Sequence, residues 1–280
     1  MTLGEVLRAA TEYLERKGVD SPRVDAELLL AHALGLERIQ LYTEHDRPLT
    51  EAERASARAL VERRGRREPL AYVLGEWGFR RVVLKTDARA LVPRPETEIV
   101  VERALALLVG VEAPRVLDVG TGTGAIALSI ASERPDAQVT ATDTSAEALA
   151  LARENAARVG VDAMKVRYVY TYLIEGLDGP FDLVVSNPPY VRAEELDSLP
   201  PELLAEPRDA LVDEGQTDAL ARDARRILDG WLVLEVHEER AREVAGRLSE
   251  LGYGAVRITP DLAGRERVVE AQWRTGSSRP

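Results

Sequence analysis

The chain has 280 residues, of which 45% are hydrophobic, so it is long enough to bury the core of one large domain or of two smaller ones. It contains no cysteine, which excludes disulfide bonds, thiolate nucleophiles and cysteine-based zinc sites. The net charge of −11 and the lack of any apolar run approaching about 18 residues predict a protein with no direct nucleic-acid binding and no membrane association.

The first 70 residues have the apolar spacing of helices. The N-terminus lacks a basic segment followed by an apolar stretch, so no signal peptide is expected and we predict a cytoplasmic protein. Ser21 and Pro22 predict the start of a second helix, with Ser21 as its N-cap. Thr50 and Glu53 fit a capping box for a helix that runs to about residue 64. We therefore predict a small helical bundle over residues 1–70.

A basic cluster closes the last of these helices. It consists of Arg63, Arg64, Arg66 and Arg67. Cations are favoured at the end of a helix by its dipole, so a solvated helix end is one interpretation and a docking patch for a partner is the other.

Residues 71–92 are rich in glycine, aromatic and β-branched residues and predict a β-hairpin connector. Beyond them, predicted strands and helices alternate, which is typical of an α/β fold with a mainly parallel sheet covered on both faces. The seven predicted strands cover 115–119, 138–142, 165–170, 181–186, 231–236, 254–259 and 266–272. The predicted helices cover 124–133, 145–158, 216–228 and 238–251. Residues 274–280 are polar and predict a flexible tail.

A glycine loop follows the first strand of this region. The loop residues are Gly120, Thr121, Gly122, Thr123 and Gly124, and a helix starts directly after them. Glycines at such a turn let the backbone pass close to a ligand. The spacing differs from the G-x-G-x-x-G of dinucleotide-binding folds, and no Gly-Lys-Ser/Thr follows to hold a triphosphate. A purely structural turn is the alternative.

Two acidic residues narrow the choice of ligand. Asp118 lies two residues before the first glycine, where a carboxylate would repel a pyrophosphate but suits an ammonium group, directly or through water. Asp143 ends the next strand, where it can accept hydrogen bonds from both hydroxyls of a ribose. A turn residue before a helix is the alternative for Asp143. Together these residues predict a site for S-adenosylmethionine.

The tetrapeptide Asn187-Pro188-Pro189-Tyr190 ends another apolar strand. Proline has no N–H and a fixed φ, so the turn is stiff and leaves carbonyl groups free to accept hydrogen bonds. The Asn187 side chain and the Pro188 carbonyl can accept both hydrogens of a planar –NH2 group, and Tyr190 can lie against that group. The guest is an amide or an exocyclic amine, unless the segment is only a proline-rich turn.

The sequence resembles the N5-glutamine methyltransferases that act on peptide chain release factors, the PrmC or HemK family. The resemblance spans nearly the whole chain and rests on five motifs: Leu91-Val92-Pro93-Arg94-Pro95-Glu96-Thr97-Glu98, Asp118 to Gly124, Asp143, Asn187 to Tyr190, and Glu206-Pro207-Arg208-Asp209-Ala210-Leu211. It implies a helical domain that recognises the release factor and, over 93–273, a Rossmann-like class I methyltransferase domain that uses S-adenosylmethionine.

The resemblance also implies the substrate, which is the glutamine side chain of the release factor's Gly-Gly-Gln motif. Asn187, Pro188 and Tyr190 are then the catalytic residues, and Pro189 joins them in binding substrate. Asn187 also contributes to the cofactor site. The family usually has an acid and then an aromatic or aliphatic residue near the adenine, but this sequence has Thr171 and Tyr172 there. Tyr172 can still pack on the purine ring, or it is an ordinary aromatic at a strand end.

Three other functions compete with this hypothesis. A glutamine methyltransferase of a large-subunit ribosomal protein would share the Asn-Pro-Pro-Tyr chemistry. An adenine-N6 DNA methyltransferase would act on a similar –NH2 group, but the acidic charge and the lack of a target-recognition domain argue against it. A non-catalytic module that docks on the translation machinery is the third. The three histidines are scattered, so no metal site is expected. We also expect a monomer.

Overall fold

The computed structural model describes residues 1–162 and 164–275, which form two compact units. The first unit contains Met1–Glu76 together with Leu199–Ala205, a segment from much later in the chain. The second unit contains the rest of the described residues. From residue 276 on, the predicted flexible tail lies outside the described residues.

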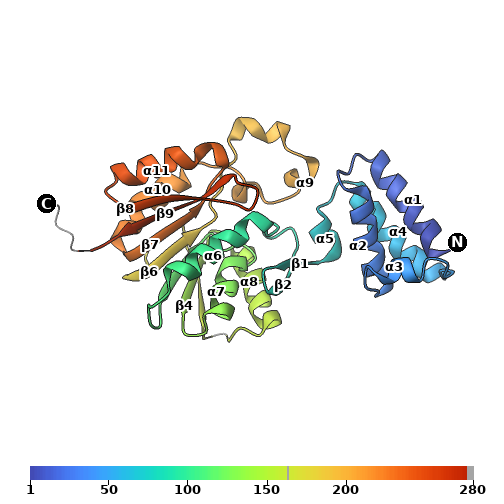
Figure 1. Cartoon of the computed structure of the whole chain (residues 1–280), viewed down its shortest axis with the longest axis horizontal. Coiled ribbons are helices and arrows are strands. Elements are labelled where there is room, and N and C mark those ends of the chain that lie inside the picture. The colour runs from blue at the N-terminus through green and yellow to red at the C-terminus, as the bar shows by residue number, and fades with distance from the viewer. Residues whose placement is uncertain (163, 276–280) are drawn as a thin grey trace. The chain divides into compact units, whose positions relative to one another are not determined.

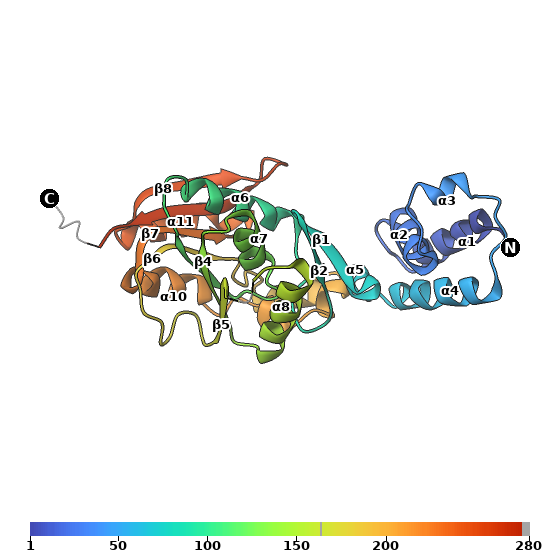
Figure 2. The same ribbon diagram turned by 90° about the horizontal axis from the view of Figure 1, so that it is seen from below.

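The first unit is the predicted helical bundle (Figure 2). Its helices are α1 (Leu3–Arg16), α2 (Pro22–Leu34), α3 (Gln40–Thr43), α4 (Glu51–Gly65), α5 (Leu70–Leu74) and α9 (Pro201–Leu204). Thr50 and Glu53 form the predicted capping box of α4. Ser21 is the N-cap residue of α2 as predicted, although its side chain makes no capping hydrogen bond. The short helix α5 was not predicted.

The arginines at the end of α4 are engaged in ion pairs within this unit. The Arg64 side chain is 8% exposed and contacts Asp25 at 2.7 Å and Glu202 at 2.6 Å. Arg67 also binds Glu202, at 2.6 Å, and Arg63 binds Glu68. A solvated helix end is therefore the wrong interpretation for Arg64, because its charge is neutralised by acids from α2 and from the distant segment 199–205.

A buried glutamate on α2 is a second centre of charge in the first unit. The Glu27 side chain is 3% exposed and accepts hydrogen bonds from Arg23 and Arg38 at 2.6 Å each and from the Tyr42 hydroxyl at 2.5 Å. Burial raises the pKa of Glu27, but these three donors outweigh burial and lower the pKa to about 2. The ionised carboxylate therefore stabilises the folded unit.

We expect Glu27→Gln to destabilise the helical unit by about 2 kcal/mol at pH 7, because an amide replaces the anion that accepts all three bonds. A carboxyl group with a lowered folded pKa contributes stability above its unfolded pKa and loses it as the pH falls through the folded value. The difference between variant and wild type should thus shrink between pH 4.5 and 2, and denaturant unfolding at several pH values measures it. Glu12→Gln, at an exposed position of α1, is the control. A difference that persists at low pH would contradict this account.

The second unit starts at Trp77, inside the predicted hairpin that β1 (Glu76–Phe79) and β2 (Val82–Lys85) form. The chain then passes through a 3₁₀ turn, Pro95–Thr97, into α6 (Glu98–Leu107). Strands and helices alternate from there, as predicted. They are β3 (Arg115–Val119), α7 (Ala125–Glu133), β4 (Gln138–Asp143), α8 (Ala146–Val159), β5 (Val166–Tyr170), β6 (Phe181–Ser186), α10 (Gln216–Asp223), β7 (Leu228–Glu235), α11 (Ala241–Glu250), β8 (Gly254–Pro260) and β9 (Glu266–Trp273).

A seven-stranded sheet forms the centre of this unit (Figure 1), in the order β5-β4-β3-β6-β7-β9-β8. The first five strands are parallel to one another, and only β9 pairs antiparallel with its neighbours. The predicted mainly parallel α/β sheet is therefore confirmed. Strand order reverses between β3 and β6, and ligands of such sheets bind beyond the carboxyl ends of the strands at this reversal.

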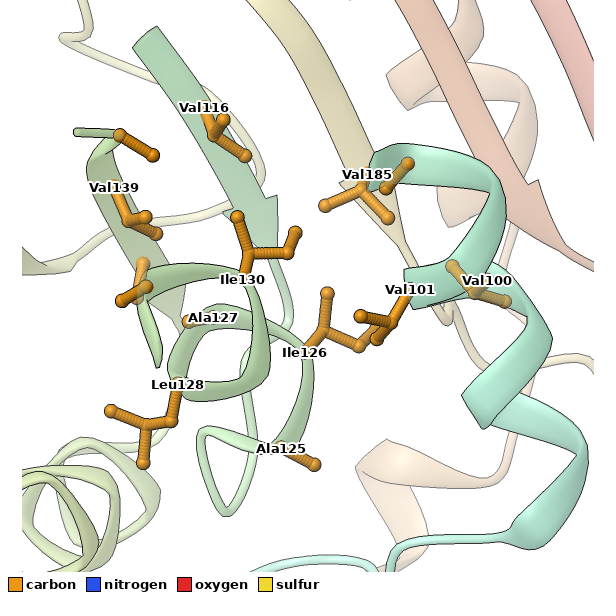
Figure 3. Packing of buried hydrophobic residues seen from close by; sticks show 14 of the residues in the cluster. Val100, Val101, Val116, Ala125, Ile126, Ala127, Leu128, Ile130, Val139 and Val185 are labelled. Atoms are coloured by element: carbon orange, nitrogen blue, oxygen red, sulfur yellow. The ribbon is translucent and has the colours of Figure 1, made fainter. Parts of the chain in front are cut away.

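The sheet is covered on both faces because consecutive strand residues point to opposite sides. Val116 belongs to a core cluster with α6 and α7, whereas Leu117 belongs to a second cluster with α10 and α11. Figure 3 shows Ile126 and Ile130 of α7 within the first cluster, near Val185 of β6. The two cores hold the carboxyl ends of the central strands in fixed positions.

One predicted helix is too long. We predicted a helix over 216–228, but α10 ends at Asp223, a 3₁₀ turn covers Ala224–Arg226, and β7 begins at Leu228. Buried apolar residues recur from Leu220 to Leu228, so the apolar pattern does not mark where the helix ends and the strand begins. Within the described residues, no helix is both long and apolar enough to cross a membrane.

Candidate functional site

Three neighbouring strands deliver the predicted site residues to one edge of the sheet. Val119 at the end of β3 pairs with Thr142 of β4 on one side and with Ser186 of β6 on the other. The residues that follow these three positions are Gly120, Asp143 and Asn187. The strand register thus brings the glycine loop, the second acid and the tetrapeptide together, at the point where strand order reverses.

The glycine loop is held against β4 by its backbone. The N–H groups of Gly120 and Thr121 both donate to the Thr142 carbonyl at 2.9 Å. Gly120 has a φ of +73°, and a Cβ atom there would meet no atom within 4 Å. The loop therefore turns tightly while leaving open space beside Gly120, which is where the backbone can approach a ligand.

Asn155 supports this loop from α8, a role that sequence analysis missed. Its side chain is fully buried, and its Nδ2 donates to the carbonyls of Thr123 at 2.9 Å and Lys85 at 3.1 Å. Its Oδ1 accepts from the Lys85 N–H at 2.7 Å. One buried amide thus ties the loop to β2 and α8. The sequence signal was an asparagine among the apolar positions of a predicted helix.

Asp118 is fully buried beneath the loop. Its Oδ2 accepts from the Thr121 hydroxyl at 2.7 Å and from the Ala127 N–H at 3.1 Å, whereas Oδ1 has no hydrogen-bond partner among the described residues. Burial raises the pKa of Asp118 to about 7, and these two hydrogen bonds oppose the rise. A buried carboxylate with a free oxygen favours a ligand with a cationic donor group. The positive charge would offset the free-energy cost of removing the carboxylate from water.

Asp143 is fixed by two backbone donors. Gly122 N–H donates to Oδ2 and Ser145 N–H donates to Oδ1, each at 2.9 Å, and burial raises the pKa of this carboxyl group. Each oxygen keeps a lone pair for a further donor. Thr171 lies beside it, because its N–H donates to the Asp143 carbonyl at 3.1 Å. The Tyr172 side chain that follows is 46% exposed.

Asn187 has a defined orientation. Its Nδ2 donates to the Thr97 hydroxyl oxygen at 3.2 Å, so the amide nitrogen is engaged and the Oδ1 atom remains available as an acceptor. Thr97 is 4% exposed and lies in the Pro-Arg-Pro-Glu-Thr-Glu segment, for which the sequence suggested no specific contact. The two motifs therefore meet in space although 90 residues separate them.

The remainder of the tetrapeptide lines the same edge. Pro188 is buried, whereas Pro189 and Tyr190 are half-buried. The Tyr190 ring lies 6.1 Å from the His237 ring at an angle of 46°, and burial raises the pKa of the Tyr190 hydroxyl. Glu235, the last residue of β7, is 1% exposed and was not among the predicted site residues. Its signal was an acid at the end of a buried strand.

Glu206 joins the segment before α6 to the chain that follows the tetrapeptide. Its side chain is 1% exposed, accepts from the Val92 N–H at 2.9 Å and forms an ion pair with Arg94. Both sequence motifs that carry these residues were recognised, but their contact was not predicted. Glu206 holds the backbone that leads to Thr97.

We expect Glu206→Ala to increase hydrogen exchange of the Val92 amide by about 100-fold, because the variant leaves a buried N–H and Arg94 without their acceptor. Hydrogen–deuterium exchange with mass spectrometry can measure this on peptides that contain residues 90–97. Asp197→Ala, which removes an exposed acid, should leave the exchange unchanged. Equal protection in Glu206→Ala and wild type would show that the carboxylate does not hold this segment.

A polar cavity of about 320 Å³ lies beyond the tetrapeptide, lined by Arg192, Ala193, Glu194, Asp213, Arg240 and Glu243. It contains none of the predicted site residues. Over the part of the chain that the structure describes, no three acidic or histidine side chains gather closely enough to hold a metal ion.

Comparison with known families matches two parts of the chain. Residues 5–75 match the PrmC N-terminal domain, and residues 98–229 match the methyltransferase small domain. A release factor glutamine methyltransferase from Deinococcus radiodurans is 45% identical over 97% of this chain and 99% of its own length. One from Rhodopirellula baltica is 39% identical over 97% and 96% of the two chains.

Solved structures agree on the fold of the second unit. The SAM-dependent methyltransferase from Agrobacterium tumefaciens covers 71% of this chain and 70% of its own, with a TM-score of 0.51 and 19% identity. At that identity the likeness concerns the fold alone. Together with the sheet order and the family matches, it identifies a class I methyltransferase fold, which a helical N-terminal unit precedes in the sequence.

Proposed function

The chain belongs to the family of release factor glutamine methyltransferases, and we propose that it methylates the side-chain amide nitrogen of the glutamine in the Gly-Gly-Gln motif of peptide chain release factors. The observation that carries this proposal is the orientation of Asn187, whose nitrogen is bound to Thr97 so that its oxygen is free to accept a substrate N–H.

We propose S-adenosylmethionine as the methyl donor, and the residues at the sheet edge fit it. The open space beside Gly120 allows close approach of the ligand, the free Oδ1 of Asp118 suits its ammonium group, and Asp143 suits its ribose hydroxyls. Thr121, Gly122, Thr123 and Gly124 complete the loop, and Thr171 and Tyr172 lie next to Asp143, where the adenine is expected. When bound, this cofactor supplies an electrophilic methyl group.

The protein's task is to orient a poor nucleophile. The lone pair of a glutamine amide nitrogen is delocalised into its carbonyl group, so attack requires the out-of-plane face of the nitrogen to point at the methyl group. Asn187 Oδ1 and the Pro188 carbonyl accept the two amide hydrogens and fix that orientation. Both hydrogen bonds strengthen as positive charge develops on the nitrogen, so they stabilise the transition state more than the bound substrate.

Tyr190 and solvent complete the proposed mechanism. The Tyr190 ring stacks on the amide plane and contributes about 1 kcal/mol to the stabilisation of the developing cation. The alkylated amide is strongly acidic and loses its proton to solvent, so the site needs no strong base. Release factors act where ribosomes translate, which supports a cytoplasmic location, and we propose that the enzyme works as a monomer.

Labelled-methyl transfer to four purified acceptors tests the function. The acceptors are a release factor, its Gly-Gly-Gln→Gly-Gly-Ala variant, large-subunit ribosomal proteins and DNA. We expect label in the first acceptor alone. Label in the alanine variant at the wild-type level would exclude the assigned glutamine, and preferential label in a ribosomal protein or in DNA would favour one of the two competing enzymes.

A further inference from the structure

A chain of three polar side chains runs from the end of β7 to the end of β6. Asn187 Nδ2 donates to Thr97 Oγ1 at 3.2 Å, and the Thr97 hydroxyl lies near enough to the Glu235 carboxyl group to lower its pKa. The register of the sheet explains why the two ends meet. Ser186 and Leu234 are paired, and the residues that follow them are Asn187 and Glu235.

The direction of these hydrogen bonds is set by the number of available hydrogens. The Thr97 hydroxyl has one hydrogen, and its oxygen already accepts from Asn187. An ionised Glu235 can only accept, so the Thr97 hydrogen points at its carboxylate. With both partners fixed, the Asn187 amide cannot rotate by 180° without losing its bond to Thr97.

We propose that Glu235 and Thr97 are positioning residues that lock the Asn187 side chain with its oxygen facing the substrate amide. The inference rests on the proposed function, because the orientation matters only if Asn187 accepts a hydrogen from the substrate. A rotated Asn187 would present its own –NH2 group to the substrate –NH2 group, and two donors cannot bind each other. The lock therefore selects the productive rotamer before substrate arrives.

The surroundings of Glu235 make this lock sensitive to pH. Burial raises the pKa of Glu235 to about 7, whereas Thr97, Arg267 and Arg94 lower it and Glu96 raises it. One of its carboxylate oxygens, Oε2, has no hydrogen-bond partner among the described residues. The other titratable groups that line its surroundings are Tyr190, His237 and Arg240. Once protonated, Glu235 can donate to Thr97, whose hydrogen then turns toward Asn187 and favours the rotated amide.

Kinetics of three variants test the lock. Thr97→Val should lower kcat by about tenfold, because it removes the acceptor that holds Asn187 Nδ2 and the hydroxyl that faces Glu235. The KM for S-adenosylmethionine should stay within about threefold, since Thr97 lies outside the cofactor loop. Thr97→Ser keeps the hydroxyl and should return kcat to within about threefold of wild type. Glu235→Gln keeps an acceptor but cannot ionise, so its kcat should lose the decline that wild type shows as the pH falls from 8 to 6.

The matched control is Thr259→Val. Thr259 donates to the buried carboxylate of Glu270 at 2.7 Å, so this variant removes the same kind of Thr–Glu hydrogen bond from the same unit. It should leave kcat and its pH profile unchanged. A Thr97→Val variant that behaves like Thr259→Val would overturn the inference, as would a Thr97→Ser variant as slow as Thr97→Val.

A measurement without substrate separates this inference from the proposed function. The side-chain amide signal of Asn187 in a nitrogen-15 NMR spectrum can be identified by its loss in Asn187→Ala. We expect that signal to titrate with a midpoint near pH 7 in wild type and to stop titrating in Glu235→Gln. A signal that does not titrate in wild type contradicts the lock. Failure of wild type to methylate a release factor contradicts only the proposed function.

Discussion

Replacement of Asn187 by alanine is expected to lower methyl transfer to the release factor by about 1000-fold, because the variant lacks the preorganised acceptor that binds the substrate amide most tightly in the transition state. The fold should persist, since the Asn187 side chain is half-buried and its only described hydrogen bond is to Thr97. Single-turnover transfer of a labelled methyl group measures how much the rate of the chemical step falls.

Cofactor affinity provides the control for this variant. Asn187 lies at the end of β6, whereas the glycine loop and Asp143 belong to β3 and β4, so calorimetry should give a dissociation constant for S-adenosylmethionine within about tenfold of wild type. Equal rates of transfer by Asn187→Ala and wild type would refute the proposed mechanism. A loss of cofactor binding as large as the loss of rate would place Asn187 in the cofactor site alone.

Replacement of Gly120 by alanine should weaken binding of S-adenosylmethionine by about 30-fold or more. A Cβ atom at this position extends into the open space over the loop, where the cofactor is proposed to lie. The left-handed φ of +73° adds a folding cost of about 1 kcal/mol, which thermal unfolding should detect. Isothermal calorimetry with the purified chain measures the affinity directly.

Gly246→Ala is the control for Gly120→Ala, because it separates a change in protein stability from a change in cofactor affinity. Gly246 lies inside α11, where an added Cβ meets no atom within 4 Å and the backbone is helical. Alanine there should stabilise the protein by about 0.5–1 kcal/mol without changing cofactor affinity. If Gly120→Ala destabilised the fold as expected but bound cofactor as tightly as wild type, the space beside Gly120 would not be the cofactor site.

Much of the second unit could be predicted because local sequence and tertiary structure agree there. The run ending at Val119 is mostly apolar and is buried on both faces, as is typical of a central parallel strand, and the glycines that follow it mark the turn. The prediction failed where local patterns are ambiguous. The buried residues around Leu228 fit a helix or a strand equally, and only pairing with Phe181 of β6 makes that segment part of β7.

The candidate site could be predicted only in part, for a related reason. Asn187 and Asp143 belong to short motifs whose spacing carries chemical meaning, so the sequence alone indicated them. Asn155, Thr97 and Glu235 act through contacts with residues far along the chain. Their local signals, a polar residue at a buried position or a place in a motif, do not say which distant residue each one contacts. The roles assigned to Thr171 and Tyr172 stay predictions.

Because Leu199–Ala205 belongs to the first unit, this protein cannot be truncated into its two units at one position. The polypeptide crosses between the units after residue 76 and twice more around that segment, so no single cut separates them. A truncation after Glu76 would give a helical fragment in which Arg64 and Arg67 had lost Glu202. It would leave the other fragment carrying an insert without its packing partner. Each part is thus expected to depend on the presence of the other to complete its fold.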